Sequence, residues 1–121
     1  METLVQPLML MTTRQRAKLL ANGFLIAAGE DCDLAPVVKL FTPDGPCTWL
    51  LVEIDPADPD RAWGLCDLGL GSPELGYVSL SELAQVLGQL GLAVERDRHF
   101  SATGPLSFYA ERARAAGRII A

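Results

Sequence analysis

Three side chains near the carboxyl end have types and spacing that suit metal or acid–base chemistry. Glu95, Asp97 and His99 alternate in a segment that predicts a short strand over 94–100, and alternate residues of a strand point to the same side. Two carboxylates and an imidazole on one side could hold a divalent metal ion or act as general acid and base. Arg96 and Arg98 lie between them and favour a simpler interpretation, an exposed strand face with balanced charge. We expect the simpler one and keep a metal-dependent enzyme as an alternative.

The second group with chemical potential is the acidic set Glu53, Asp55, Asp58 and Asp60. A calcium loop needs oxygen ligands at tight spacing and usually a glycine at its sharp turn, and this stretch has two prolines and no glycine. Carboxylates of this kind are mostly exposed to solvent. If the set has a role, contact with a basic protein surface is favoured over a metal. We therefore take these four residues as the candidate partner-binding site.

The carboxyl-terminal end carries five arginines that could contact phosphate, namely Arg96, Arg98, Arg112, Arg114 and Arg118. The chain as a whole has a net charge of -5 and a pI near 4.7, so it repels a phosphate backbone. A DNA-binding accessory protein is thus a second alternative, and we do not favour nucleic acid as the partner.

No pattern for nucleophilic catalysis or for nucleotide binding is present. The chain has one histidine, and Cys32, Cys47 and Cys66 form no Cys-x-x-Cys pair. No Gly-x-Ser-x-Gly elbow exists, and no lysine of the phosphate-loop type follows a glycine run. We expect no catalytic residue, no metal and no cofactor, with three reduced thiols as in a cytoplasmic protein.

Charge is distributed unevenly along the chain. From Glu30 to Glu74 there are ten acidic residues against Lys39 and Arg61, a net charge of −8. From Gly91 to Ala121 there are five arginines against three acidic residues, a net charge of +2. An acidic middle on a folded body is suited to docking on a basic surface.

The length and composition predict a globular protein. The chain has 121 residues, half of them apolar, which suits a single domain over 1–121 with its own core. Residues 1–11 are apolar and predict a strand or an arm that packs its leucines and methionines on the domain. No apolar run approaches the roughly 20 residues that a membrane span needs, so we expect a cytoplasmic protein with no membrane contact.

The elements that must position these residues begin with a meander of strands. Strands are predicted over 37–41, 47–54 and 62–70, the second of them central because it is apolar on both faces. Thr42-Pro43-Asp44-Gly45 predicts a tight turn between the first two. The acidic stretch 55–60 is expected to leave the sheet, since its prolines cannot donate to a ladder.

Capping patterns predict three helices. Thr12-x-x-Gln15 predicts a helix over 13–21 that Asn22-Gly23 ends. Ser79-x-x-Glu82, followed by leucines at three- and four-residue steps up to Leu90, predicts a helix closed by Gly91. The last helix is predicted to open at Pro105 and to fade at Gly117. Together these elements predict an α+β fold, a small antiparallel sheet of three to five strands in a meander with about three helices packed on it.

Several short segments, taken in this order, resemble the family catalogued as domain of unknown function 2958, found on plasmids, phages and other mobile elements of bacteria. They are Lys39-Leu40-Phe41-Thr42-Pro43, Thr48-Trp49 with Glu53, Trp63-Gly64-Leu65, the ten residues from Glu74 to Leu83, and the seven from Gly91 to Asp97. The resemblance covers about residues 15 to 108. It implies an α+β fold and a mobile-element setting, with no established activity and no catalytic residue.

The leading hypothesis is a non-enzymatic, protein-binding accessory protein of a mobile genetic element. A sharper version is an inhibitor of a host defence complex, of the CRISPR or restriction kind, in which the acidic surface competes for a site that normally takes nucleic acid.

Overall fold

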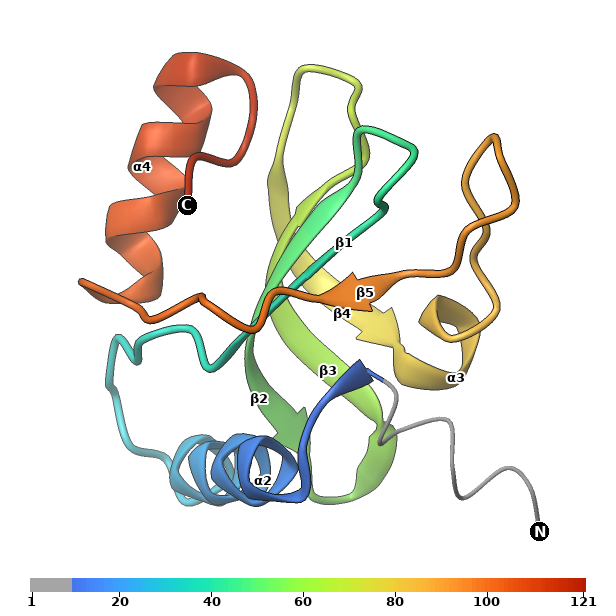
Figure 1. The fold of residues 1–121 in the computed structure, drawn as a ribbon. Helices are drawn as coiled ribbons and strands as arrows, with labels where there is room; N and C mark the ends of the chain where they lie inside the picture. Colours follow the sequence, from blue (N-terminus) through green and yellow to red (C-terminus); the bar gives the residue numbers. More distant parts are fainter. Residues whose placement is uncertain (1–9) are drawn as a thin grey trace, which may run out of the picture.

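The computed structural model describes residues 10–121 and shows an antiparallel five-stranded sheet with helices on both faces (Figure 1). The helices are α2 (Thr13–Ala27), α3 (Leu80–Leu83) and α4 (Leu106–Ala116), and the strands are β1 (Val38–Phe41), β2 (Thr48–Asp55), β3 (Asp58–Asp67), β4 (Glu74–Ser79) and β5 (Glu95–Arg96). The strand order is β4-β3-β2-β1-β5, so four consecutive strands form the meander and β2 is central. The predicted α+β fold and the central place of the second strand are confirmed.

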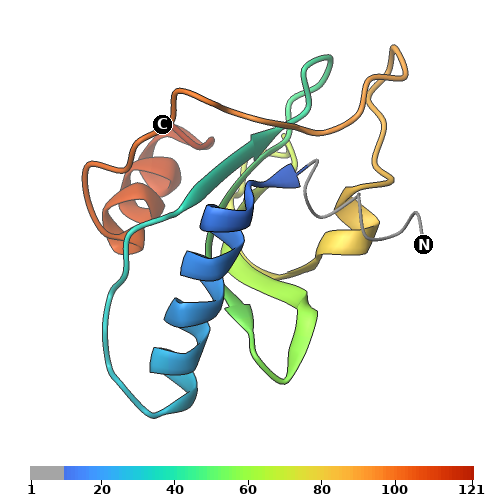
Figure 2. The same ribbon diagram turned by 60° about the horizontal axis from the view of Figure 1, so that its bottom comes forward.

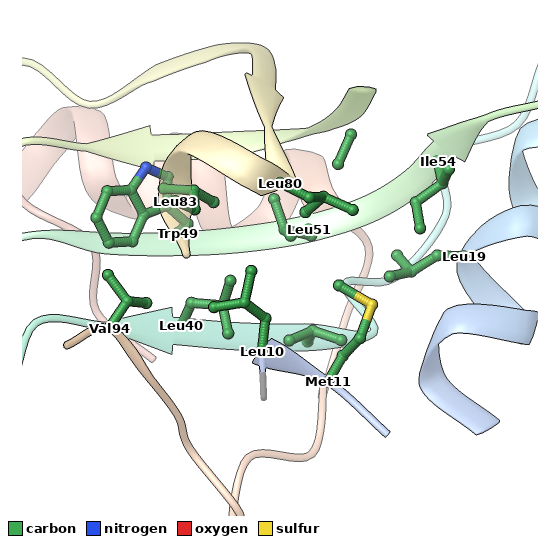
Figure 3. Close-up of a cluster of buried hydrophobic side chains, with 12 residues drawn as sticks. Leu10, Met11, Leu19, Leu40, Trp49, Leu51, Ile54, Leu80, Leu83 and Val94 are labelled. Carbon is green, nitrogen blue, oxygen red and sulfur yellow. The ribbon is translucent and has the colours of Figure 1, made fainter. Parts of the chain in front are cut away.

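One face of the sheet is closed by α2 and α3, which lie apart from α4 in both ribbon views (Figures 1 and 2). Figure 3 shows Leu19 of α2 and Leu80 and Leu83 of α3 pointing at the sheet residues of this core. Leu10 and Met11 are also fully buried there, as expected for the end of the predicted arm. The rest of that arm, residues 1–9, lies outside the described residues.

The other face carries α4. Its apolar side and the segment after it pack on three residues of the central strands; the set is Leu106, Tyr109, Ala110, Ala113 and Ile119 against Leu50, Val52 and Leu65. The helix begins after Pro105 and ends at Gly117, whose φ of 76° is the left-handed conformation that favours glycine at a helix end. Both predicted boundaries of this helix are confirmed.

The first helix is longer than predicted, because Asn22-Gly23 does not end it. Both residues are buried in the middle of α2, where the helix crosses β2. A Cβ on Gly23 would lie 1.9 Å from the carbonyl oxygen of Ile54, so the glycine allows the helix and the strand to approach. The pair that signals a helix end in the sequence serves here as a point of close packing.

The helix predicted from Leu80 to Leu90 stops at Leu83, so that prediction is wrong for its second half. Leu87 and Leu90 are 62% and 80% exposed. The carboxylate of Asp44, in the β1–β2 turn, accepts hydrogen bonds from the backbone N–H groups of Leu90 (2.6 Å) and Leu92 (3.3 Å). These bonds hold the segment as a loop against the turn, and they outweigh the leucine pattern.

The acidic stretch 55–60 also differs from the prediction, because it stays in the sheet. β2 runs to Asp55 and β3 starts at Asp58, with only Pro56 and Ala57 as the turn. Pro59 falls where the β2–β3 register shifts, and β3 pairs with β4 only from Arg61 onward. The missing N–H of the proline therefore interrupts no regular ladder.

Two further strand boundaries differ. β3 ends at Asp67 rather than at residue 70, since the Asp67 carboxylate accepts a hydrogen bond from the N–H of Gly69 (2.8 Å) and turns the chain there. The strand predicted over 94–100 shrinks to the two residues of β5, although the N–H of Asp97 still donates to the carbonyl oxygen of Lys39 (2.9 Å).

Within residues 10–121 no helix is both long enough and apolar enough to cross a bilayer.

Candidate functional site

A β-bulge in the central strand moves one carboxylate from the closed core to the opposite face of the sheet. Leu51 lies opposite Gly64, but the next pair is Glu53 with Trp63, so Val52 is an extra residue. Residues directly opposite each other in an antiparallel pair point to the same face. Glu53 therefore lies on the face of Trp63, the face that α4 partly covers.

Helix α2 holds this bulge in place. A bulge leaves backbone groups without a ladder partner, and the side-chain Nδ2 of Asn22 donates a hydrogen bond of 2.8 Å to the carbonyl oxygen of Val52. Gly23, the next residue, packs directly against the carbonyl of Ile54. Asn22 and Gly23, which were predicted to end the helix, thus contact the bulge that sets the position of Glu53.

Glu53 lines a pocket of about 210 Å³ whose walls are mainly apolar. Leu34, Val52, Trp63, Leu75 and Leu106 supply most of the apolar wall. These residues come from the loop after α2, from three strands of the sheet and from α4. The pocket is therefore formed only when the meander, the loop and the last helix are all in place.

The Glu53 side chain is buried and has no partner within residues 10–121. It is 8% exposed, and no hydrogen bond or ion pair to its carboxylate is found among the described residues. Burial raises its pKa above the ordinary value, and the neighbouring negative charge of Asp55 raises it further. Among the described residues, the fully buried side-chain oxygens without a partner are Asn22 Oδ1 and Asp44 Oδ1, so the Glu53 oxygens keep some contact with solvent through the pocket.

A second carboxylate at the pocket, that of Asp33, differs from Glu53 because it has hydrogen-bond partners within the fold. It accepts hydrogen bonds from the backbone N–H of Ser107 (3.2 Å) and from the Ser107 hydroxyl, and so ties the loop after α2 to the first turn of α4. Its charge adds to the negative potential around Glu53 while its oxygens are used by the fold.

The acidic set predicted as a partner-binding site divides in the structure. Asp55 and Asp58 are opposite each other at the β2–β3 hairpin, and Asp55 lies 3.9 Å from Arg61. Asp58 is exposed and accepts only the N–H of Asp60 (3.3 Å). Glu53 lies in the wall of the pocket, so the set is one hairpin pair, one pocket carboxylate and Asp60. Their role in partner binding stays a prediction.

Asp60 acts on the fold. Its carboxylate accepts hydrogen bonds from the Ser79 hydroxyl (2.6 Å) and from the N–H of Ser81 (2.8 Å), at the start of α3. Partial burial alone would raise the pKa of Asp60, but these bonds, together with the positive charge of Arg16, lower it overall. This carboxylate joins the hairpin to α3.

Beside the pocket, no helix within residues 10–121 covers this face of β4. Leu75 and Tyr77 are each 47% exposed, and the Tyr77 ring packs edge-on against Trp63 with 4.8 Å between centroids. The guanidinium of Arg61 lies 3.7 Å from the centre of the Tyr77 ring. Leu75 and Trp63 belong both to this strip and to the pocket wall, so the two surfaces are continuous.

The sequence analysis named Glu53 but missed the pocket. A signal was present, since Glu53 interrupts the apolar run of β2 between Val52 and Ile54. That interruption could not show which face the carboxylate takes, because the face depends on the bulge.

The alternative metal set lies in a separate hollow of about 440 Å³. Glu95, Asp97 and His99 line it together with Lys39, whose Nζ is 3.3 Å from the Asp97 carboxylate. The hydrogen bond from the His99 N–H and the contact with Lys39 lower the pKa of Asp97. In the part of the chain that is described, no three His, Cys, Asp or Glu side chains are grouped so as to hold a metal ion.

Of the remaining candidates, Arg112 and two of the cysteines have contacts or burial that the structure shows. Arg112 of the arginine group places its guanidinium 5.1 Å from the ring centre of Phe108, on the same helix. Burial and the nearby Glu74 carboxylate raise the pKa of Cys66 to about 11, and burial also raises that of Cys47. Both thiols are protonated at neutral pH, a poor state for a nucleophile.

The comparisons with known proteins agree with the resemblance seen in the sequence. A family model described as "Protein of unknown function (DUF2958)" matches residues 10–120, which is nearly the whole chain. No curated protein and no solved structure matches.

Proposed function

Because this chain belongs to the DUF2958 family, which carries no assigned activity, we propose its function from its surface: it is a non-enzymatic protein that binds a basic surface of another protein. The binding face is the part of the sheet beside α4 that no helix covers, with the carboxylates of the β2–β3 hairpin at its border.

The observation that carries this proposal is a buried carboxylate without a partner beside exposed apolar side chains. Glu53 has no hydrogen bond or ion pair within the described residues, and Leu75 and Tyr77 remain half exposed next to it. An exposed apolar strip with polar residues around it is typical of a protein-binding surface. A basic partner would supply the charge that Glu53 lacks.

The hairpin adds long-range attraction to this surface. Asp55 and Asp58 are at its end, and Asp58 is exposed. Charges at the rim of an interface mainly raise the association rate and make it dependent on salt. Arg61 compensates part of the charge of Asp55, so Asp58 is the stronger contributor.

The setting of this activity, as we propose it, is a mobile genetic element in the bacterial cytoplasm. The partner is a host defence complex of the CRISPR or restriction kind, and the acidic face competes for a basic site that normally takes nucleic acid. The net charge of -5 supports this version, since the protein itself is repelled by the nucleic acid it would displace.

The experiment measures binding of the purified protein to purified defence complexes, and the displacement of their nucleic acid, at low and at physiological salt. Asp58→Lys should weaken binding by about tenfold, with most of the loss in the association rate. Glu111→Lys is the matched control, because it makes the same charge change on the exposed side of α4. Equal losses for the two variants, or no binding by the wild-type protein to any such complex, would contradict the proposal.

A further inference from the structure

We propose that the Glu53 pocket receives the guanidinium group of an arginine side chain presented by the partner protein. This inference rests on the proposed function and names the chemical group that its binding face would recognise.

The negative charge of Glu53 sets the sign of the charge that the pocket accepts. The carboxylate is 8% exposed, lines the pocket and has no hydrogen-bond or ion-pair partner within residues 10–121. An unpaired buried carboxylate destabilises the folded state, and a cation placed beside it removes that penalty. The occupant that the pocket fits is therefore positively charged.

The apolar wall of the pocket favours an organic cation over a metal ion. A divalent metal needs several oxygen or nitrogen ligands, and the pocket supplies only Glu53 and an Asp33 carboxylate that is already bonded to Ser107. Leu34, Val52 and Leu106 would instead contact an aliphatic chain. A volume of about 210 Å³ is several times the ~30 Å³ that one liquid water occupies, so it admits such a chain.

The aromatic ring in the pocket wall favours the planar guanidinium of arginine over the ammonium of lysine. Arginine has a planar guanidinium that stacks on aromatic rings and can bind a carboxylate through two parallel hydrogen bonds. Trp63 provides a ring in the pocket wall on the strand opposite Glu53. The adjacent strip already holds one such contact, since Arg61 stacks on Tyr77 at 3.7 Å. A lysine ammonium would form an ion pair with Glu53 but would not stack on the Trp63 ring as a planar group does.

The test uses a small probe, so it does not depend on the identity of the partner. N-acetyl-arginine methylamide is titrated into the full-length protein, and the two indole N–H signals are followed by NMR. Trp63 lines the pocket, whereas Trp49 is 3% exposed in the opposite core and serves as the internal reference. We expect a saturable shift of the Trp63 signal alone, with a dissociation constant on the order of 1 mM, about 4 kcal/mol.

Two controls isolate the charge. The citrulline analogue has the same length and no charge, and it should bind at least tenfold more weakly. Glu53→Gln should weaken the arginine probe by a similar factor, and its free energy of unfolding shows whether it is folded. Asp58→Asn, an equal change at the exposed hairpin, should change probe binding by less than about twofold, because screening weakens exposed charges.

The outcomes separate this inference from the proposed function. If the arginine probe leaves Trp63 unchanged while Asp58→Lys still weakens partner binding, the pocket inference is overturned and the proposed function stands. Agmatine, a free guanidinium compound, is the other source of the same chemistry. If agmatine binds more than tenfold tighter than the arginine derivative, the occupant is a small-molecule ligand, and the proposal of an arginine side chain from a partner protein is overturned.

Discussion

Two buried carboxylates on neighbouring strands, Asp67 at one end of β3 and Glu53 near the far end of β2, are used in opposite ways. Asp67 is 3% exposed and accepts hydrogen bonds from the N–H groups of Gly69 (2.8 Å) and Ile119 (2.9 Å). Glu53 is 8% exposed and has no such partner within residues 10–121. Asp67 is therefore held by the fold, whereas the charge of Glu53 is left for the partner that we propose.

Three of the other eight acidic residues between Glu30 and Glu74 resemble Asp67. Asp44 holds the loop at Leu90, Asp60 holds the start of α3, and Asp33 holds the start of α4. Each of these bonds joins segments that are far apart in sequence. With Asp67, four of the ten acidic residues between Glu30 and Glu74 therefore bond distant segments of the fold, and fewer charges than the sequence indicates remain for a partner.

The largest effect should come from removing the carboxylate that has two partners. Asp67→Ala leaves two backbone N–H groups without an acceptor, one of them on buried Ile119, and should lower the free energy of unfolding by about 2–4 kcal/mol. Urea unfolding measures this loss. Glu53→Ala is the comparison, and a loss as large as that of Asp67→Ala would mean that the Glu53 carboxylate also has partners in the fold.

The next effect tests the support of the bulge. Gly23→Ala places a methyl group 1.9 Å from the carbonyl oxygen of Ile54, so α2 must shift; we expect a loss of about 1–3 kcal/mol. The shift should move the NMR signals of Trp63 beside Glu53 and leave those of Ile119 beside Asp67 unchanged. Gly76→Ala is the control, since no atom lies within 4 Å of its Cβ, and it should change stability by less than about 0.5 kcal/mol. Equal losses would show that the close approach of α2 is not what holds the bulge.

Asn22 and Gly23 also show which features of the fold the sequence does not predict, namely those that depend on contacts between distant residues. The first three strands of the meander, the turn at Thr42 to Gly45 and the capped starts of the helices follow from local chemistry, whereas the local patterns single out no strand range for β4. Asn22-Gly23 was misinterpreted because its partners, Val52 and Ile54, are about thirty residues away. A local pattern cannot distinguish a glycine that ends a helix from one that lets a strand approach.

The candidate site was predictable only in part, for the same reason. A glutamate inside the apolar run of β2 was visible, and it belonged to the predicted binding set. Its face depends on one extra residue in the strand, Val52, and the pocket depends on a loop and a helix from distant parts of the chain. Likewise, the helix predicted up to Leu90 failed because Asp44, more than forty residues earlier, holds that segment.

A smaller loss is expected at Asp60, a carboxylate that has partners but is exposed. Asp60→Ala removes the acceptor for the Ser79 hydroxyl and the Ser81 N–H, and should cost about 1–2 kcal/mol in urea unfolding. Asp58→Ala, two residues earlier, should cost less than about 0.5 kcal/mol. If the two variants lose the same amount, the bonds to α3 contribute nothing measurable.

The smallest effect, and the one that most sharpens the comparison, is the pH dependence of Glu53→Gln. The pKa of Glu53 is raised in the folded protein, so the folded state keeps this proton to higher pH than the unfolded chain does. The free energy of unfolding therefore falls as pH rises through that interval. The charged or titratable groups around the carboxylate are Asp33 and Cys32 from the loop and Asp55 from its own strand, and none is a cation.

Glutamine removes the charge and keeps the shape, so the variant should be more stable than the wild type at pH 8. This advantage should shrink as the pH falls and should vanish below the ordinary value of 4.5, where both states of the wild type hold the proton. Asp60→Asn should show the opposite sign, because a lowered pKa contributes stability above 3.8 that is lost in acid. Urea unfolding at several pH values measures both. A Glu53→Gln advantage that grows as the pH falls would mean that the carboxylate is stabilised when charged, and Glu53 would then belong with Asp67.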